Sequence, residues 1–205
     1  MATSSVPSSG DGRRRRREAG RAAVLDALID LVLEHGAPPA ADDIADRAGV
    51  SSASLFRYYP SLDELREAAI GRYFERFDTL ISLPESRPRS TASRIRTLVE
   101  ARLTFYDHVA PMARLARRQA ALVPALRCSL DRVRSIFVEQ LAIWFEDELA
   151  RFPPKERRQR IAVLAALTSF EAWDQLGESG LDRDQLNRAL RRSLADLLGP
   201  TSRRA

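Results

Sequence analysis

Apolar residues recur at helical spacing along most of the 205-residue chain, and no run alternates between apolar and polar residues as a strand would. Two long apolar stripes cover residues 126–149 and 186–198, and each predicts one helix. Prolines separate the stripes, and proline is well tolerated only in the first turn of a helix. The pattern therefore predicts an all-α fold of about nine helices.

Local signals predict where several of these helices begin. Ser61 and Glu64 have the spacing of a capping box, in which a serine hydroxyl and a glutamate side chain each satisfy a free backbone amide. Asp182 and Gln185 form a similar pair ahead of the last stripe. Further expected helix starts are Thr91, Pro111 and Pro124.

Residues 41–59 predict two short helices joined by a sharp turn. Asp42 and Asp43 suit the positive end of the first helix, and Gly49 is the residue type that ends a helix in the left-handed conformation. Ser51 or Ser52 would then cap the second helix by accepting from its free amides. This arrangement is that of a helix-turn-helix DNA reader; a hairpin that serves only for packing is the alternative.

The second of these helices has one apolar and one open face. Leu55 and Tyr59, four residues apart, are expected to face the core. Small residues followed by an arginine and a tyrosine allow the other face to enter a major groove and form hydrogen bonds there. The predicted DNA-binding residues of this segment are Ser51, Ser52, Ala53, Ser54, Phe56, Arg57 and Tyr58.

From Arg21 to about Arg72 the chain resembles the DNA-binding domain of the TetR family of bacterial regulators. The resemblance rests on residues 25–36, 44–51, 54–59 and 63–65. It implies a homodimer that binds a double-stranded DNA operator, represses transcription and is released by a small-molecule effector. A helical protein-interaction module without sequence-specific DNA binding is the alternative function.

Three positions depart from the family pattern. Phe56 stands where the family usually has tyrosine, Leu62 where it has lysine, and Ala40 and Ala41 near a usual threonine. In the family these residues donate hydrogen bonds to DNA phosphates. Other groups must therefore supply the missing contacts with phosphate.

The basic N-terminal segment is the candidate. Residues 1–21 carry six arginines and two acids, a net charge of +4, whereas residues 22–60 carry two arginines and six acids, a net charge of −4. We expect residues 1–20 to be a disordered basic arm that neutralises phosphates or simply stays solvated. Its DNA-binding residues would be Arg13, Arg14, Arg15, Arg16 and Arg17.

Two C-terminal segments predict a dimer. Residues 161–167 are apolar all round, so that helix needs a partner on opposite sides. Pairing with a symmetry mate would form a four-helix bundle, while a wholly intramolecular core is the alternative. Residues 168–176 also resemble the dimer-forming region of many TetR regulators. The predicted interface residues are Leu164, Leu167, Leu186, Leu190, Leu194 and Leu197.

The resemblance further implies a small-molecule pocket in the C-terminal domain. The candidate lining residues are aromatic, and they could equally be ordinary core residues. They are Phe105, Tyr106, Trp144, Phe145, Phe170 and Trp173. His35 and His108 fall in different predicted helices, and no nucleophile, phosphate-binding or metal-ligand motif accompanies them. We therefore expect no enzyme activity, metal or cofactor.

Composition adds the remaining expectations. The net charge of +5 permits nucleic-acid binding, and the one cysteine, Cys128, excludes an internal disulfide and suits a reducing cytoplasm. The longest near-apolar run, residues 161–170, is about half of what spanning a bilayer requires. We divide the chain into the arm at 1–20, the helix-turn-helix domain at 21–72, and a ligand-binding and dimerisation domain at 73–200.

Overall fold

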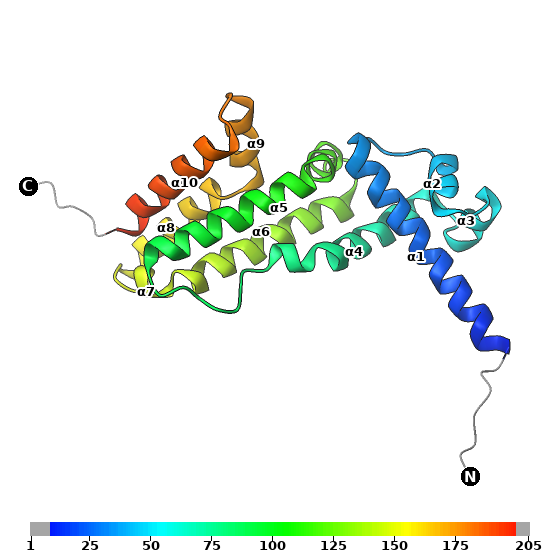
Figure 1. Cartoon of the computed structure of the whole chain (residues 1–205), viewed down its shortest axis with the longest axis horizontal. Coiled ribbons are helices and arrows are strands. Elements are labelled where there is room, and N and C mark those ends of the chain that lie inside the picture. The colour runs from blue at the N-terminus through cyan, green and yellow to red at the C-terminus, as the bar shows by residue number, and fades with distance from the viewer. Residues whose placement is uncertain (1–8, 200–205) are drawn as a thin grey trace, which may run out of the picture. The chain divides into compact units, whose positions relative to one another are not determined.

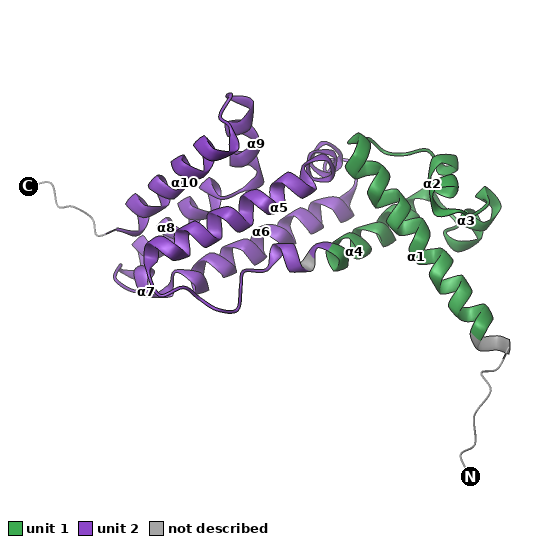
Figure 2. Ribbon diagram, viewed as in Figure 1, with its two compact units in different colours: residues 1–76 green, residues 77–205 purple. Residues whose placement is uncertain are grey.

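The computed structural model describes residues 9–199, apart from the side chains of residues 9–11 and 78. Within these residues it contains ten helices and no strand (Figure 1), which confirms the predicted all-α class. The chain forms two compact units, unit 1 (Met1–Arg76) and unit 2 (Phe77–Ala205), shown in Figure 2. The boundary between them falls inside helix α4 (Leu62–Ile81).

Unit 1 contains α1 (Ser9–His35), α2 (Ala41–Ala48), α3 (Ser52–Tyr58) and the first part of α4. Its core is made by residues that the helical pattern places on inner faces. Two ion pairs join α1 to the unit 1 part of α4: Arg72 pairs with both carboxylate oxygens of Asp26 at 2.9 Å, and Arg76 pairs with Asp30 at 2.5 Å. The fully or almost fully buried core residues include Val24, Ile29, Val32, Ile44, Leu55, Tyr59 and Leu65.

The expected disordered arm is wrong for residues 9–20, which belong to α1; residues 1–8 lie outside the described part of the chain. Arginine, alanine and glutamate are good helix formers, and Gly20 is the one glycine between residues 13 and 35. Arg14 also pairs with Glu18 one turn later, at 3.4 Å. Local propensity therefore extends the helix through the arginine run.

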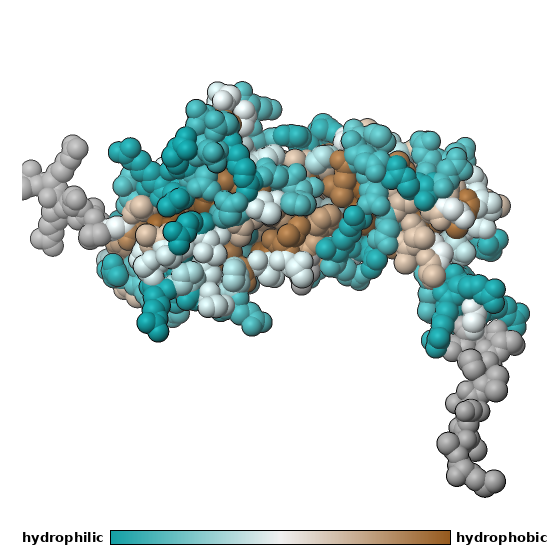
Figure 3. All heavy atoms as spheres, viewed as in Figure 1, coloured by the Kyte–Doolittle hydropathy of each residue, from teal (hydrophilic) through white to brown (hydrophobic). Residues whose placement is uncertain are grey.

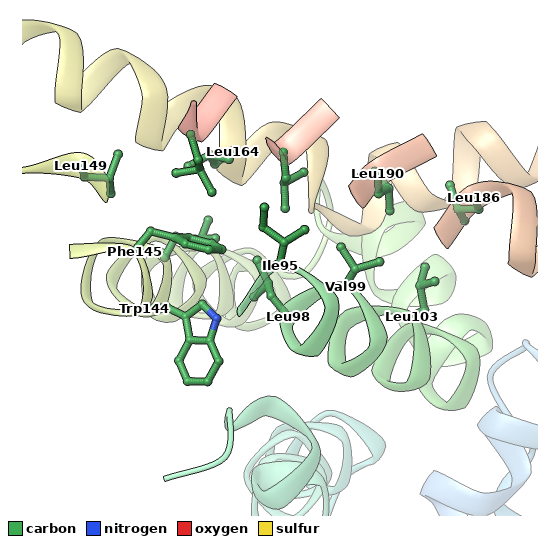
Figure 4. Packing of buried hydrophobic residues seen from close by; sticks show 13 residues of the cluster. Ile95, Leu98, Val99, Leu103, Trp144, Phe145, Leu149, Leu164, Leu186 and Leu190 are labelled. Atoms are coloured by element: carbon green, nitrogen blue, oxygen red, sulfur yellow. The ribbon is translucent and has the colours of Figure 1, made fainter. Parts of the chain in front are cut away.

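Unit 2 contains α5 (Thr91–Gln119), α6 (Pro124–Trp144), α7 (Glu146–Leu149), α8 (Pro154–Leu167), α9 (Phe170–Glu178) and α10 (Arg183–Leu198). Helix α5 packs against α6 and α10, and α8 packs against the same two helices. In Figure 4, Leu186 and Leu190 of α10 face Val99 and Leu103 of α5 across the core. The interior is therefore closed by helices from the beginning and the end of the unit.

Capping serines and acids begin the helices largely as predicted. Ser90 caps α5 by accepting from the Ser93 amide at 3.2 Å, and Pro124 opens α6. Asp182 and Gln185 form both hydrogen bonds of the predicted capping box. At Ser61 the structure contains the serine half of the box, a 3.2 Å bond from the Glu64 amide.

Two predicted boundaries are wrong. Pro111 lies inside α5 instead of beginning a helix, because buried Val109, Ala110 and Leu115 on either side anchor the helix and outweigh the lost backbone bond. The single helix predicted over residues 126–149 is divided at Phe145, whose φ of −112° and ψ of 28° leave the helical region. Phe145 thereby places its side chain in the core at 0% exposure.

Candidate nucleic-acid interface

The turn between α2 and α3 has the predicted geometry. Gly49 adopts φ 66° and ψ 32°, the left-handed conformation that glycine takes without steric strain. Its amide donates to the carbonyl of Asp46 at 3.1 Å, and the Val50 amide donates to that of Ala45 at 3.0 Å. These bonds satisfy the last carbonyls of α2 and redirect the chain into α3.

Ser51, and not Ser52, caps α3. The Ser51 hydroxyl accepts from the Ser54 amide at 3.2 Å. Ser52 instead donates to a carboxylate oxygen of Asp42 on α2, at 2.7 Å. One serine therefore begins the helix, and the other holds the two helices of the motif together.

The inner face of α3 is anchored on α1. Leu55 and Tyr59 are 0% and 3% exposed, as the four-residue spacing predicted. Burial raises the pKa of the Tyr59 hydroxyl, which donates to the carbonyl of Arg21 at 3.3 Å. The Arg21 guanidinium donates to the carbonyl of Tyr58 at 2.7 Å and lies 4.5 Å from the centre of the Tyr59 ring. These contacts fix the end of α3 from two directions.

The outer face of α3 presents Ala53, Phe56 and Arg57, all exposed. Phe56 is 43% exposed, an unusual position for a large apolar ring. Arg57 donates from Nη2 to the hydroxyl of Ser54 at 2.8 Å. The sequence-predicted contact residues thus meet on one surface, with Ser51 exposed and Ser52 and Ser54 half-buried beside it.

Tyr58 differs from the other predicted contact residues on α3 because its ring lies against Gly20 of α1. A Cβ atom at Gly20 would lie 2.7 Å from the Tyr58 hydroxyl oxygen, so the missing side chain of Gly20 makes room for the ring. Gly20 and Arg21 are not among the residues predicted for this surface. The available signal was a glycine inside a strong helical pattern, which often marks a close approach.

The arginine run comes close to α3 through this contact. Arg16 and Arg17 precede Gly20 by one helical turn, which is about 5.4 Å of axial rise. Successive residues of a helix point about 100° apart, so the run surrounds α1 and does not form a single stripe. Its five members, Arg13, Arg14, Arg15, Arg16 and Arg17, are all exposed.

Several acids of unit 1 are paired with arginines, which reduces the negative charge expected from the sequence count. Glu34 accepts two hydrogen bonds from Arg47, at 2.7 and 2.8 Å, and this lowers the pKa of the Glu34 carboxyl. Asp26 and Asp30 pair with arginines of α4. The body that carries α3 is therefore less repulsive to phosphate than its composition suggests.

Comparison with known proteins agrees with this geometry. Residues 24–69 match the model of the tetR family of bacterial regulatory proteins. Unit 1 carries a tetR-family domain. The matched residues extend from the middle of α1 into α4 and include the whole α2–turn–α3 motif.

One curated relative of this chain is the HTH-type transcriptional activator FasR of Mycolicibacterium smegmatis. The two are 35% identical over 101 residues, which cover 47% of this chain and 45% of FasR. The chain thus spans less than half the length of that relative.

Solved structures are similar over most of the chain. A tetR-family transcriptional regulator from Streptomyces coelicolor has a TM-score of 0.70 at 22% identity, covering 88% of this chain and 80% of that one. A transcriptional regulator from Rhodococcus sp. RHA1 has a TM-score of 0.68 at 21% identity, covering 87% and 95%. At such identities the likeness concerns the fold.

Beyond the tetR-family domain, the predicted pocket residues lie in two places in unit 2. Trp144 and Phe145 belong to the aliphatic core, where the Trp144 indole donates to the carbonyl of Arg94 at 3.0 Å. The other four form one cluster with Phe137 of α6, in which the Tyr106 ring contacts each of the others and contacting ring centroids are 5.2–6.5 Å apart. We call this set the aromatic cluster: Phe105, Tyr106, Phe137, Phe170 and Trp173.

The predicted dimer residues lie mainly inside the chain's own core. Leu164, Leu186, Leu190 and Leu194 are at most 5% exposed, and Leu167 and Leu197 pack partly buried against them. The intramolecular packing of α8 and α10 against α5 and α6 covers these side chains, so they offer little surface to a second copy. On the face shown in Figure 3, α9 and α10 are mostly hydrophilic.

Three small apolar residues of α8 are exposed. Ala162, Val163 and Ala166 share one side of the helix, and Val163 is 45% exposed. Among the residues that the structure describes, no group of three or more His, Cys, Asp or Glu side chains gathers as a metal site would. The same residues include no helix long and apolar enough to cross a membrane.

Proposed function

We propose that this protein is a transcriptional regulator that binds DNA as a homodimer, with α3 of each copy in the major groove of an inverted-repeat operator. The observation that carries the proposal is the exposed face of α3, which follows a turn of the tetR family. Ala53 allows close approach to the bases, Arg57 supplies hydrogen-bond donors, and Phe56 offers an apolar edge to a thymine methyl group. Twofold symmetry then sets the half-sites about one helical turn apart, ~34 Å.

Two features support the electrostatic part of this proposal. The arginine run on α1 lies within a few turns of the Gly20–Tyr58 contact, so it continues the surface formed by α3. Lysine and arginine side chains near phosphates release condensed counterions, which favours binding at low salt. The run therefore compensates for Phe56 and Leu62, which carry no donor for a phosphate oxygen.

The effector and the direction of regulation follow from family resemblance. Unit 2 would bind a small molecule that changes operator affinity without any chemical step. Release of a repressor is our expectation, whereas FasR is by its name an activator. The operator's position separates the two, because a repressor site overlaps the promoter and an activator site lies upstream of it.

The decisive experiment is selection of genomic fragments by the full-length protein at moderate salt. We expect enrichment of one inverted repeat, which is reduced and relaxed at one position in Arg57→Ala and unchanged in Arg132→Ala, a control at an exposed arginine of α6. A helical interaction module would retain fragments without preference. That outcome would contradict the proposal.

A further inference from the structure

Arg102 of α5 lies in the interior of unit 2 and is 2% exposed. Its Nη2 donates to Oε1 of Gln140 at 2.8 Å, and its guanidinium carbon lies 3.4 Å from the centre of the Phe137 ring. Its Nε is buried and has no hydrogen-bond partner among the described residues. A guanidinium has five N–H donors, and the surrounding described residues leave the buried Nε donor unused.

The positive charge of Arg102 also has no partner of opposite sign among the described residues. Arg94, the other buried arginine of α5, pairs with the fully buried carboxylate of Glu148. The partner of Arg102 is instead the neutral amide of Gln140, whose nitrogen donates to the carbonyl of Ile81 at 2.9 Å. Buried charges in proteins are almost always paired, because removing an ion from water is expensive.

The guanidinium remains charged under ordinary conditions. Burial lowers the pKa of Arg102 to about 10, which is still well above neutrality. The Phe137 ring offsets part of the lost hydration through a cation–π contact, but it accepts no hydrogen bond at Nε. The site therefore holds a positive charge that no acidic side chain among the described residues balances.

The surroundings of Arg102 are apolar and aromatic. Phe137, which covers the guanidinium, is part of the aromatic cluster. The cluster continues through Tyr106 to Phe170 and Trp173 of α9. An anion that pairs with Arg102 would thus lie beside the Phe137 ring of α6, and Tyr106 of α5 links that ring to the rest of the cluster.

We propose that unit 2 binds a small apolar molecule with one carboxylate group, which pairs with Arg102 while its body packs on the aromatic cluster. The guanidinium fork matches a carboxylate and can donate two parallel hydrogen bonds. A single negative charge balances Arg102, whereas a doubly charged phosphate would leave an excess charge in the apolar interior. The inference rests on the proposed function, because it gives the chemical class of the effector.

The ligand-free protein provides the first test. Arg102→Met removes an unpaired charge and keeps the side-chain length, so we expect its melting temperature to rise. Arg94→Met is the matched control: it leaves the carboxylate of Glu148 buried without its partner, so we expect the melting temperature to fall. A fall of similar size in both variants would show that Arg102 is structural and would overturn the proposal.

Matched probes provide the second test, with the full-length protein. One pair is 1-naphthylacetate and 1-naphthylacetamide, the other dodecanoate and dodecanol. Binding is followed by the fluorescence of Trp144 and Trp173, the two tryptophans of the chain, and by the shift in melting temperature. We expect each carboxylate to bind at least tenfold more tightly than its neutral partner.

The variants then locate the preference. Arg102→Met should bind both members of each pair equally, and Arg102→Lys, which keeps the charge but not the fork, should retain a reduced preference. Equal binding within both pairs by the wild-type protein, or no binding of any probe, overturns the proposal. If Arg102→Met does not fold, Arg102→Lys is the test: a weaker preference for the carboxylate probes than in the wild type supports the proposal, and an unchanged preference contradicts it.

Operator retention without probes separates this inference from the proposed function. If the protein binds DNA selectively but shows no preference for carboxylates, only the anion-site proposal is wrong. If it prefers carboxylates through Arg102 but selects no DNA, the anion-site proposal holds and the proposed regulator function is wrong.

Discussion

Arg57 is oriented by its own helix through the 2.8 Å bond from Nη2 to the hydroxyl of Ser54. A preoriented arginine can bind guanine O6 and N7 together, so we expect it to read one base in each half-site. Arg57→Ala should weaken operator binding by about 1–3 kcal/mol and relax the preference at one position. Ser54→Ala should give a smaller loss at the same position. Affinities measured on operators substituted base by base check both expectations.

A phosphate contact would give a different result for Arg57. Affinity would then fall evenly across operator variants, and the salt dependence would flatten by about one counterion. That pattern would contradict base reading while leaving the DNA-binding surface in place.

Gly20 is a second residue with a specific expected effect. Alanine usually stabilises a helix over glycine by about 0.5–1 kcal/mol, but a Cβ here would meet Tyr58 at 2.7 Å. The Tyr58 ring must then move, and the Arg57 guanidinium, 5.5 Å from its centre, loses that neighbour. We expect Gly20→Ala to weaken operator binding without the usual gain in melting temperature.

Gly71 of α4 is the matched control, because a Cβ there would meet nothing within 4 Å. Gly71→Ala should raise the free energy of unfolding by about 0.5–1 kcal/mol. Equal stabilisation by both substitutions, with operator binding unchanged, would show that Gly20 is not required for the placement of Tyr58.

These residues also show which contacts of the DNA-binding surface can be predicted from the sequence. Ser51, Ala53 and Arg57 were identified because caps and helix faces depend on neighbours within a few residues. The half-burial of Tyr58 depends on Gly20, 38 positions earlier in the chain. Periodicity carries no signal for such a contact, so Tyr58 was placed on the open surface.

At the scale of the helix, the N-terminal half of α1 is expected to contribute charge without base selectivity. Replacing Arg13, Arg14, Arg15, Arg16 and Arg17 by alanine keeps helix propensity and removes five charges. Binding to all DNA should weaken, and the salt slope should fall by about 0.9 for each phosphate contact removed. Affinity titrations at several salt concentrations measure this, with circular dichroism as the control for helix content. An unchanged salt dependence would show that the arginine run does not contact DNA phosphates.

Helices α5, α6 and α9 are joined at Glu171, whose Oε1 accepts from Arg117 and Arg134, each at 3.0 Å. Burial raises the pKa of Glu171, but the hydrogen bond from Arg117 and further contacts outweigh it and lower the pKa to about 2. The stabilisation of the folded state by the ionised Glu171 carboxylate is therefore fully present above the pKa of glutamate in the unfolded chain, about 4.3, and is lost as the pH falls towards 2.

We expect Glu171→Gln to lower the melting temperature at pH 7 and to have less effect at pH 3. Because the Glu171 side chain is 47% exposed, solvent screening keeps the effect modest. Glu139→Gln, at an exposed position of α6, is the control and should change neither value. A difference between wild type and Glu171→Gln that does not depend on pH would contradict the ion-pair explanation.

Over the whole chain, the class of fold and most helix starts could be predicted because periodicity, caps and turn glycines are local signals. Pro111 was misplaced because buried neighbours on both sides keep α5 continuous, which is a property of packing. The leucines of α8 and α10 are predicted at a dimer interface, and in the structure they pack within the chain's own core. Sequence alone could not decide whether the covering surface belongs to the same chain or to a second copy. Arg102 lies one turn from Leu98 and from Tyr106 on the same face of α5, so helical spacing agrees with its burial, but spacing cannot identify its partner.

The dimer prediction changes accordingly. Because Leu190 and Leu194 fill the chain's own core, aspartate at either position should unfold unit 2 and report nothing about association. The exposed side of α8 is the surface that a symmetry mate could cover. Ala162, Val163 and Ala166 there are small enough for two helices to approach closely.

We therefore expect Val163→Asp with Ala166→Asp to give a folded monomer, because both residues are exposed and a carboxylate on each copy would face its mate. Sedimentation of wild type and variant at micromolar concentration measures this, and thermal unfolding confirms that the variant is folded. Operator affinity should fall steeply when dimerisation is lost, since a single α3 contacts only one half-site. Lys155→Asp, at the exposed start of α8, is the control and should remain dimeric. If the variant sediments as a dimer like the wild type, the interface does not include the exposed side of α8. If the wild-type protein is a monomer, the proposal of a twofold operator complex is wrong.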